Sequence, residues 1–223
     1  MRKLFLAELV IMLVLACSHI AVAEEGAHAA EVAPKPGSRW YPYADRYNAW
    51  QQDRPLLLAA LHNSVPRDHL AERTERFKAA GLNTLIWWKP ANALHVFEAA
   101  HKAGLEWACG SVGGTKAITA AMRIPGCSFV MAGDEPSRED ELPRIAAIAD
   151  WVQKKHPDKP VFSNLSISKI DHDLYVEKCR PDVFSFDHYP LQRDGQTHDH
   201  YLYNVAWGLQ TVRKYRLPYW MLL

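Results

Sequence analysis

Segments typical of strands and helices alternate along most of this chain, and this alternation limits the folds it can adopt more than any other feature. The predicted strands are residues 56–61, 82–88, 105–110, 128–132, 161–163, 182–186 and 218–223. The predicted helices are residues 67–80, 91–103, 115–123, 139–155, 171–178 and 200–215. Two of these helices end in similar sequences, which close at Gly81 and Gly104. Glycine at these positions can adopt the left-handed conformation that terminates a helix. Strict alternation predicts a parallel sheet with right-handed crossovers.

The length of the repeating unit, about 28 residues, favours a (β/α)8 TIM barrel of about 250 residues. Residues 55–223 hold about six and a half such units, so we predict a single partial TIM-barrel domain, truncated in its seventh strand. An open parallel α/β sheet is the alternative. It is disfavoured because no glycine-rich phosphate-binding turn follows the first strand.

Composition fits one such core and argues against some partners. The chain has 223 residues, of which 48% are hydrophobic, and this suffices for one sizeable core. The formal net charge is +1 and charges of both signs are interspersed, so we expect no nucleic-acid partner. The 8 tryptophans suit a carbohydrate ligand, whose C–H faces stack on aromatic rings, although a place in the core is the better interpretation for any one of them.

The amino terminus has the features of an export signal. A basic start, an apolar run at 9–17 and small residues up to Ala23 predict a signal peptide over residues 1–23. The mature protein is then secreted or periplasmic, and the apolar run is too short for a stable membrane span. The alternative is a lipoprotein anchored at Cys17.

Residues 24–54 separate this signal from the barrel. The first part, 24–38, is rich in alanine, proline and polar residues and is predicted to be a flexible leader. The second part, 39–53, holds five tyrosines and tryptophans, too many for a disordered segment. We expect it to pack across the bottom of the barrel or to line an outer binding wall.

Acidic residues follow two of the predicted strands. Strand 128–132 runs into Gly133-Asp134-Glu135-Pro136, and a helix start follows directly. Strand 182–186 runs into Asp187-His188-Tyr189-Pro190. Because the carboxyl ends of parallel strands meet at one edge, where α/β proteins place their chemistry, we expect the two groups to face one site.

These two stretches resemble the clan-A glycoside hydrolases. In that clan an Asn-Glu pair ends strand four, with the glutamate as general acid/base, and a second glutamate ending strand seven is the nucleophile. The resemblance implies that Glu135 is the general acid/base of an exported enzyme that hydrolyses O-glycosidic bonds of a poly- or oligosaccharide. Asp134 stands where the clan has asparagine, a ligand of the sugar 2-hydroxyl, and the strand-seven glutamate has no counterpart in this chain.

Asp187 is the candidate for a second catalytic carboxylate, with a structural hydrogen-bond acceptor as its alternative role. Alternation along its strand places Asp187 and Tyr189 on one face and His188 on the other. The resemblance implies that His188 and Tyr189 contact the sugar. Further candidates for substrate binding at strand ends, each with a plain packing role as its alternative, are His62, Trp87, Trp88 and Asn164.

Two other function classes stay open. A barrel fragment without the strand-seven nucleophile could bind carbohydrate without turnover, and its open edges would then be covered by the aromatic segment or by a second copy in an oligomer. A metal-dependent hydrolase is suggested by the acid and histidine clusters at 171–173 and 198–200. Neither cluster has the i, i+4 histidine spacing of a helical zinc site, so we expect solvated surface, with no metal and no cofactor.

Overall fold

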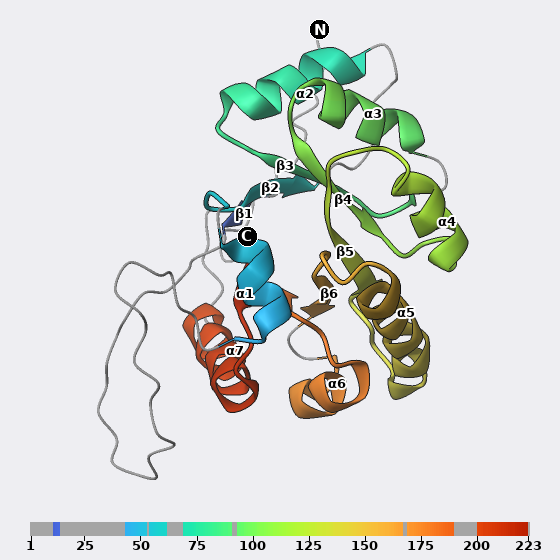
Figure 1. Cartoon of the computed structure of the whole chain (residues 1–223). Helices are drawn as coiled ribbons and strands as arrows, with labels where there is room; N and C mark the ends of the chain where they lie inside the picture. The colour runs from blue at the N-terminus through green and yellow to red at the C-terminus, as the bar shows by residue number, and fades with distance from the viewer. Residues whose placement is uncertain are drawn as a thin grey trace, which may run out of the picture.

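The computed structural model describes residues 11–13, 43–52, 54–61, 69–90, 93–166, 169–189 and 200–222. Its strands form one barrel in which each strand neighbours the next in sequence (Figure 1). The strands are β1 (Ile11–Leu13), β2 (Leu58–Leu61), β3 (Thr84–Trp87), β4 (Glu106–Gly110), β5 (Cys127–Asp134), β6 (Val161–Ser166), β7 (Phe184–Asp187) and β8 (Tyr219–Leu222). The helices are α1 (Asp45–Gln51), α2 (Leu70–Ala79), α3 (Leu94–Lys102), α4 (Gly114–Ala121), α5 (Leu142–Lys155), α6 (His172–Cys179) and α7 (Tyr201–Tyr215), with a short 3-10 helix η3 (Glu139–Glu141) before α5.

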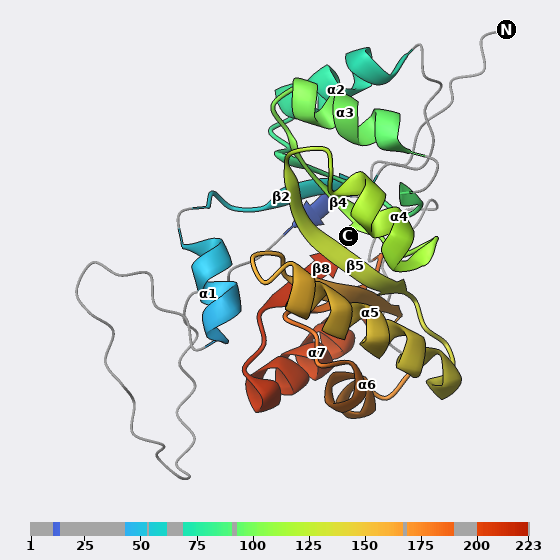
Figure 2. The ribbon, with the colours of Figure 1, turned by 45° about the vertical axis from the view of Figure 1, so that its right-hand side comes forward.

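Strands β2 to β8 are the predicted parallel set, and they confirm the partial TIM barrel. Each pairs in parallel with the next, and helices α2 to α7 lie outside the sheet between them (Figures 1 and 2). The ring is closed by β1, which pairs antiparallel with both β2 and β8. The fold is therefore a seven-stranded parallel α/β barrel of incomplete TIM type with one antiparallel closing strand.

The closing strand was not predicted. It lies within residues 1–23, which the sequence predicts to be a signal peptide. Cleavage after Ala23 remains a prediction, and it would remove the strand that pairs with β2 and β8. Within the described ranges, no helix combines the length and the apolar character needed to cross a bilayer.

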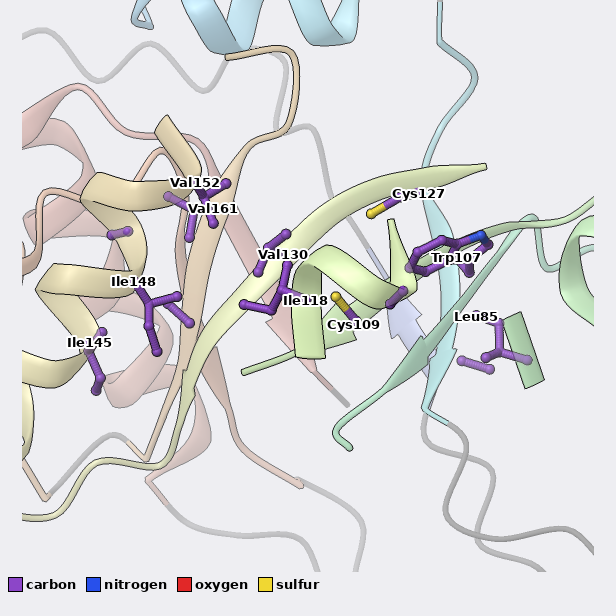
Figure 3. Packing of buried hydrophobic residues seen from close by; sticks show 14 of the residues in the cluster. Leu85, Trp107, Cys109, Ile118, Cys127, Val130, Ile145, Ile148, Val152 and Val161 are labelled. Atoms are coloured by element: carbon purple, nitrogen blue, oxygen red, sulfur yellow. The ribbon is translucent and has the colours of Figure 1, made fainter. Parts of the chain in front are cut away.

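Alternation along the strands sorts the core into two layers. Inward-facing residues of the strands form the barrel interior, with Ile86, Phe129, Phe162 and Trp220 among its members. Outward-facing residues pack under the helices, and Figure 3 shows Val130 of β5 in this layer with Ile118 of α4 and Ile148 of α5. Because a one-residue slip would exchange the two faces, this burial fixes the register of the strands.

Helix α1 lies at the amino-terminal end of the barrel strands, apart from helices α2 to α7 (Figure 2). The Trp50 indole donates to the Ser128 carbonyl at the start of β5 at 3.0 Å. Arg46 forms an ion pair with Asp182, just before β7, and donates to the Pro157 carbonyl at 2.7 Å. Of the two places considered from the sequence, this part of the aromatic segment occupies the bottom of the barrel.

Candidate active site

Polar residues singled out from the sequence lie at or near the carboxyl ends of three adjacent strands. Asp134 ends β5 and is paired in register with Asn164 of β6. Asp187 ends β7 and is paired with Ser166, the last residue of β6. The strand register thus brings Asp134, Asn164 and Asp187 to one edge, opposite the end that α1 covers.

Glu135 is held in an unusual backbone conformation. Its φ is +41°, one of three positive φ values at described residues other than glycine. The Glu135 amide donates to the Asn164 carbonyl at 2.7 Å, which ties this turn to β6. A side chain at positive φ is strained, and such strain is concentrated at functional sites.

The carboxyl groups of Glu135 and Asp187 interact, and each is among the causes of the pKa shift of the other. Burial raises the pKa of Asp187 to about 7, with further contributions from the hydrogen bond to Glu135 and from its charge. The pKa of Glu135 is lowered, first by the hydrogen bond from Lys169 and then by that from Asp187. Of the two carboxyls, Asp187 therefore keeps a proton to the higher pH, and Glu135 ionises first.

Asn164 connects the carboxylates. Its side-chain amide donates to Asp187 Oδ2 at 3.2 Å and to Asp134 Oδ1 at 3.3 Å. Tyr189 OH donates to the same Asp187 oxygen at 3.3 Å. Burial raises the pKa of Asp134, and the bond from Asn164 partly offsets this. Burial and the charge of Asp187 raise the pKa of Tyr189, so its hydroxyl keeps its proton.

Lys169 belongs to this site, although sequence reasoning did not select it. Its ammonium lies 2.5 Å from Glu135 Oε2. The two side chains are 43% and 38% exposed, so the ion pair faces solvent. The one sequence feature that could have identified Lys169 is its position. It follows the end of β6 by three residues and so lies at the same edge of the barrel.

The structure places His188 away from the carboxyl pair. It is buried, with Nδ1 2.8 Å from the Asn204 amide nitrogen of α7 and its ring edge-on to Tyr201. Alternation along β7 turns this side chain outward into the layer under α7. The sugar contact that the resemblance implied for His188 therefore has no support in its position, whereas Tyr189 contacts Asp187 as alternation predicted.

The other aromatic candidates at this edge lie on opposite faces of the sheet. Trp87 packs against the outer layer, and its indole donates to the Lys89 carbonyl at 3.2 Å. Trp88 packs against the barrel interior. A Cβ at Gly110 would lie 2.4 Å from the Trp88 carbonyl oxygen, so glycine is required for this close approach. His62 lies outside the described residues.

The cluster at 171–173 has structural roles. Asp171 caps α6 by accepting from the Leu174 amide at 2.7 Å, and Asp173 pairs with Lys214 at 2.6 Å. His172 is buried and stacked on Trp207. Among the described residues no three potential ligands are grouped as a metal site would need, and two members of the 198–200 cluster lie outside them.

No known family matches the sequence, and no curated protein matches it. Among solved structures, SuiB of Streptococcus suis bound to S-adenosylmethionine is similar with a TM-score of 0.50 and 11% identity, over 81% of this chain and 49% of that one. The HpcH/HpaI aldolase of Desulfitobacterium hafniense DCB-2 has a TM-score of 0.49 and 15% identity, over 72% and 74%. An endo-1,4-beta-mannanase of Rhizomucor miehei has a TM-score of 0.43 and 9% identity, over 70% and 81%.

At such low sequence identities, structural similarity is informative about the fold alone. The chain spans about half the length of SuiB, as the 49% coverage states. The other similar structures include an aldolase, a dipeptide epimerase and a mannanase, and no family or activity of this chain follows from them.

Proposed function

We propose that this chain is an exported acid/base hydrolase of O-glycosidic bonds in an oligo- or polysaccharide. One observation carries the proposal: at the carboxyl ends of the strands, Glu135 has a positive φ and an ion pair with Lys169, and it interacts with Asp187, whose pKa is raised to about 7. Two carboxyl groups whose environments separate their pKa values are how a hydrolase obtains an acid and a base at one pH. Glycoside hydrolysis uses such a pair.

The resemblance implied that Glu135 is the general acid. The directions of the two pKa shifts instead favour Asp187 as the general acid and Glu135 as the base or nucleophile. Asp187 keeps its proton up to about pH 7 and so is the better donor to the leaving glycosidic oxygen. Glu135 is ionised beside Lys169 and so is the better base or nucleophile. In this assignment Asn164 and Tyr189 position the acid, and Lys169 keeps the proton off Glu135.

Substrate binding has to separate the two carboxyls. Retaining enzymes hold them about 5–5.5 Å apart and inverting enzymes about 6.5–9.5 Å apart, both wider than a hydrogen bond. Asp187 is 8% exposed and held by two donors, whereas the Glu135 side chain is 38% exposed. Glu135 and Lys169 are therefore the groups that move, swinging outward when a sugar enters between the carboxyls.

The same contact favours a second candidate, carbohydrate binding without turnover. If the pair stays hydrogen-bonded when a sugar binds, the acid cannot reach a glycosidic oxygen, and Asp134, Tyr189 and Trp88 would serve as ligands only. In that case the wild-type protein binds a glycan and releases no product from it.

Assays of aryl glycosides and polysaccharides distinguish these functions. The variants are Asp187→Asn and Glu135→Gln, with Glu139→Gln as the matched control, since Glu139 is an exposed carboxylate in η3. Loss of a general acid should lower kcat/KM by about 10²–10⁴-fold in Asp187→Asn, and Glu139→Gln should equal wild type. Equal rates in wild type and Asp187→Asn would refute the acid assignment, and glycan binding with no turnover in wild type would establish the second candidate.

A further inference from the structure

Three polar side chains lie side by side in the barrel interior, one layer below the carboxyl pair. Asn164, Ser185 and Trp220 are in-register partners on β6, β7 and β8. Trp220 belongs to the interior cluster, and Asn164 follows the interior residue Phe162 by two positions. Ser185 lies between two phenylalanines that face the outer layer, so it also faces inward.

Each of the three carries a buried atom that lacks a hydrogen-bond partner among the described residues. The residues are 2%, 0% and 1% exposed in the order Asn164, Ser185 and Trp220. The atoms are Asn164 Oδ1, Ser185 Oγ and Trp220 Nε1. Buried polar groups in native proteins are nearly always satisfied, by protein or by ordered water.

The three atoms are chemically complementary. The indole N–H only donates, the amide oxygen only accepts, and the hydroxyl does both. The orientation of the Asn164 amide follows from its other end, because its nitrogen donates to Asp134 and to Asp187. Turning the amide round would set its oxygen against carboxylate oxygens, so Oδ1 faces the interior.

We infer that these three residues form a binding site for a single internal water molecule, which fixes the Asn164 amide and thereby positions Asp187. The water accepts from Trp220 Nε1 and donates to Asn164 Oδ1, and Ser185 Oγ supplies the third bond of the usual internal water. Neighbouring strands lie about 4.8 Å apart, a spacing close to that of two polar atoms that one water molecule bridges. Asn164 is then a positioning residue, held from below by the water and bonded above to two carboxyls.

The inference predicts the direction in which the pKa of Asp187 shifts when the water site is disrupted. The bond from Asn164 favours the ionised form of Asp187 and lowers its pKa. If Asn164 loses its support from below, that bond weakens, and the pKa of Asp187 should rise. This consequence does not depend on the proposed hydrolysis, because it concerns a proton equilibrium and not turnover.

A crystal structure at about 1.5 Å and a titration of Asp187 test the inference. We expect a water peak in wild type within hydrogen-bond distance of at least two of the three atoms. In Ser185→Ala, and separately in Trp220→Phe, the pKa of Asp187 measured by carboxyl ¹³C NMR should rise by about 0.5. The matched control is Ser163→Ala, a buried serine of β6 that packs toward Tyr175 in the outer layer, and it should leave the titration unchanged.

Each outcome decides the question. A wild-type crystal without a peak at this position overturns the water site, whatever the variants do. A peak combined with an unchanged Asp187 titration in both interior variants overturns the positioning role. The wild-type crystal tests the water site without any variant, so the inference can still be refuted if a variant fails to fold.

Discussion

Replacing Asp187 with asparagine should stabilise the protein at alkaline pH and leave its stability at acid pH almost unchanged. The carboxyl is 8% exposed, and its pKa is raised from the ordinary value of 3.8 to about 7. Asparagine resembles the protonated acid in shape, can donate toward Glu135 as the acid does, and can accept from Asn164 and Tyr189. It differs in that it never has to ionise.

The magnitude follows from linkage. Above pH 4 the unfolded chain releases the Asp187 proton, whereas the folded chain keeps it until about pH 7. Folding therefore loses about 1.4 kcal/mol of stability for each pH unit across this window, and the loss stops above pH 7. The difference of about 3 between the two pKa values corresponds to about 4 kcal/mol, which is the largest gain that Asp187→Asn can show at pH 8.

Urea unfolding of wild type and Asp187→Asn at five pH values from 4 to 8.5 measures this difference. Subtracting the two curves cancels groups such as Asp134 and Asp182, whose pKa values burial also raises. Glu139→Gln is the control for loss of an exposed carboxylate elsewhere in the chain. The reasoning is refuted if the Asp187→Asn difference is independent of pH, or if this variant is the less stable protein at pH 8.

Three further results are expected. Lys169→Met should raise the pKa of Glu135, because it removes the largest cause of its depression, and the acid limb of the kcat/KM profile should move to higher pH. Arg46→Met should destabilise the protein by about 3–5 kcal/mol in chemical denaturation, because it leaves the buried Asp182 carboxylate without its ion-pair partner. Expression with the native amino terminus should yield a secreted chain that begins after Ala23, which intact mass measures.

Much of the fold was predictable because each β/α unit carries its own signals. Apolar runs, amphipathic helices and terminating glycines lie close together in the sequence, and their alternation permits few topologies. The predicted ends of strands were less accurate. β5 runs to Asp134 and β6 to Ser166, beyond the predicted 132 and 163, since their polar last residues still pair with the neighbouring strand.

The closing strand could not have been predicted from the same signals. The apolar run that contains β1 satisfies the pattern of a signal peptide as well as that of a strand, and three paired residues leave little periodicity. Its pairing with β2 and β8 depends on two strands that are far away in the sequence. Local patterns carry no information about such a partnership.

The candidate site was predictable in position and not in protonation. Glu135 and Asp187 follow strands, and the rule that strand ends share one edge places them together. Which of them keeps the proton depends on the burial of Asp187 and on Lys169, a residue from a third loop that no motif marks. The outward position of His188 follows from alternation, which proved the better guide to this residue than the resemblance.

The central claim, that Asp187 and Glu135 share one proton held by the aspartate, is tested most directly by ¹³C NMR titration of the side-chain carboxyls. Asp187 should titrate near pH 7 in wild type and at a lower pH in Glu135→Gln, because this variant removes both the charge and the accepting carboxylate. A titration of Asp187 near its ordinary value of 3.8, unchanged by Glu135→Gln, would contradict the claim.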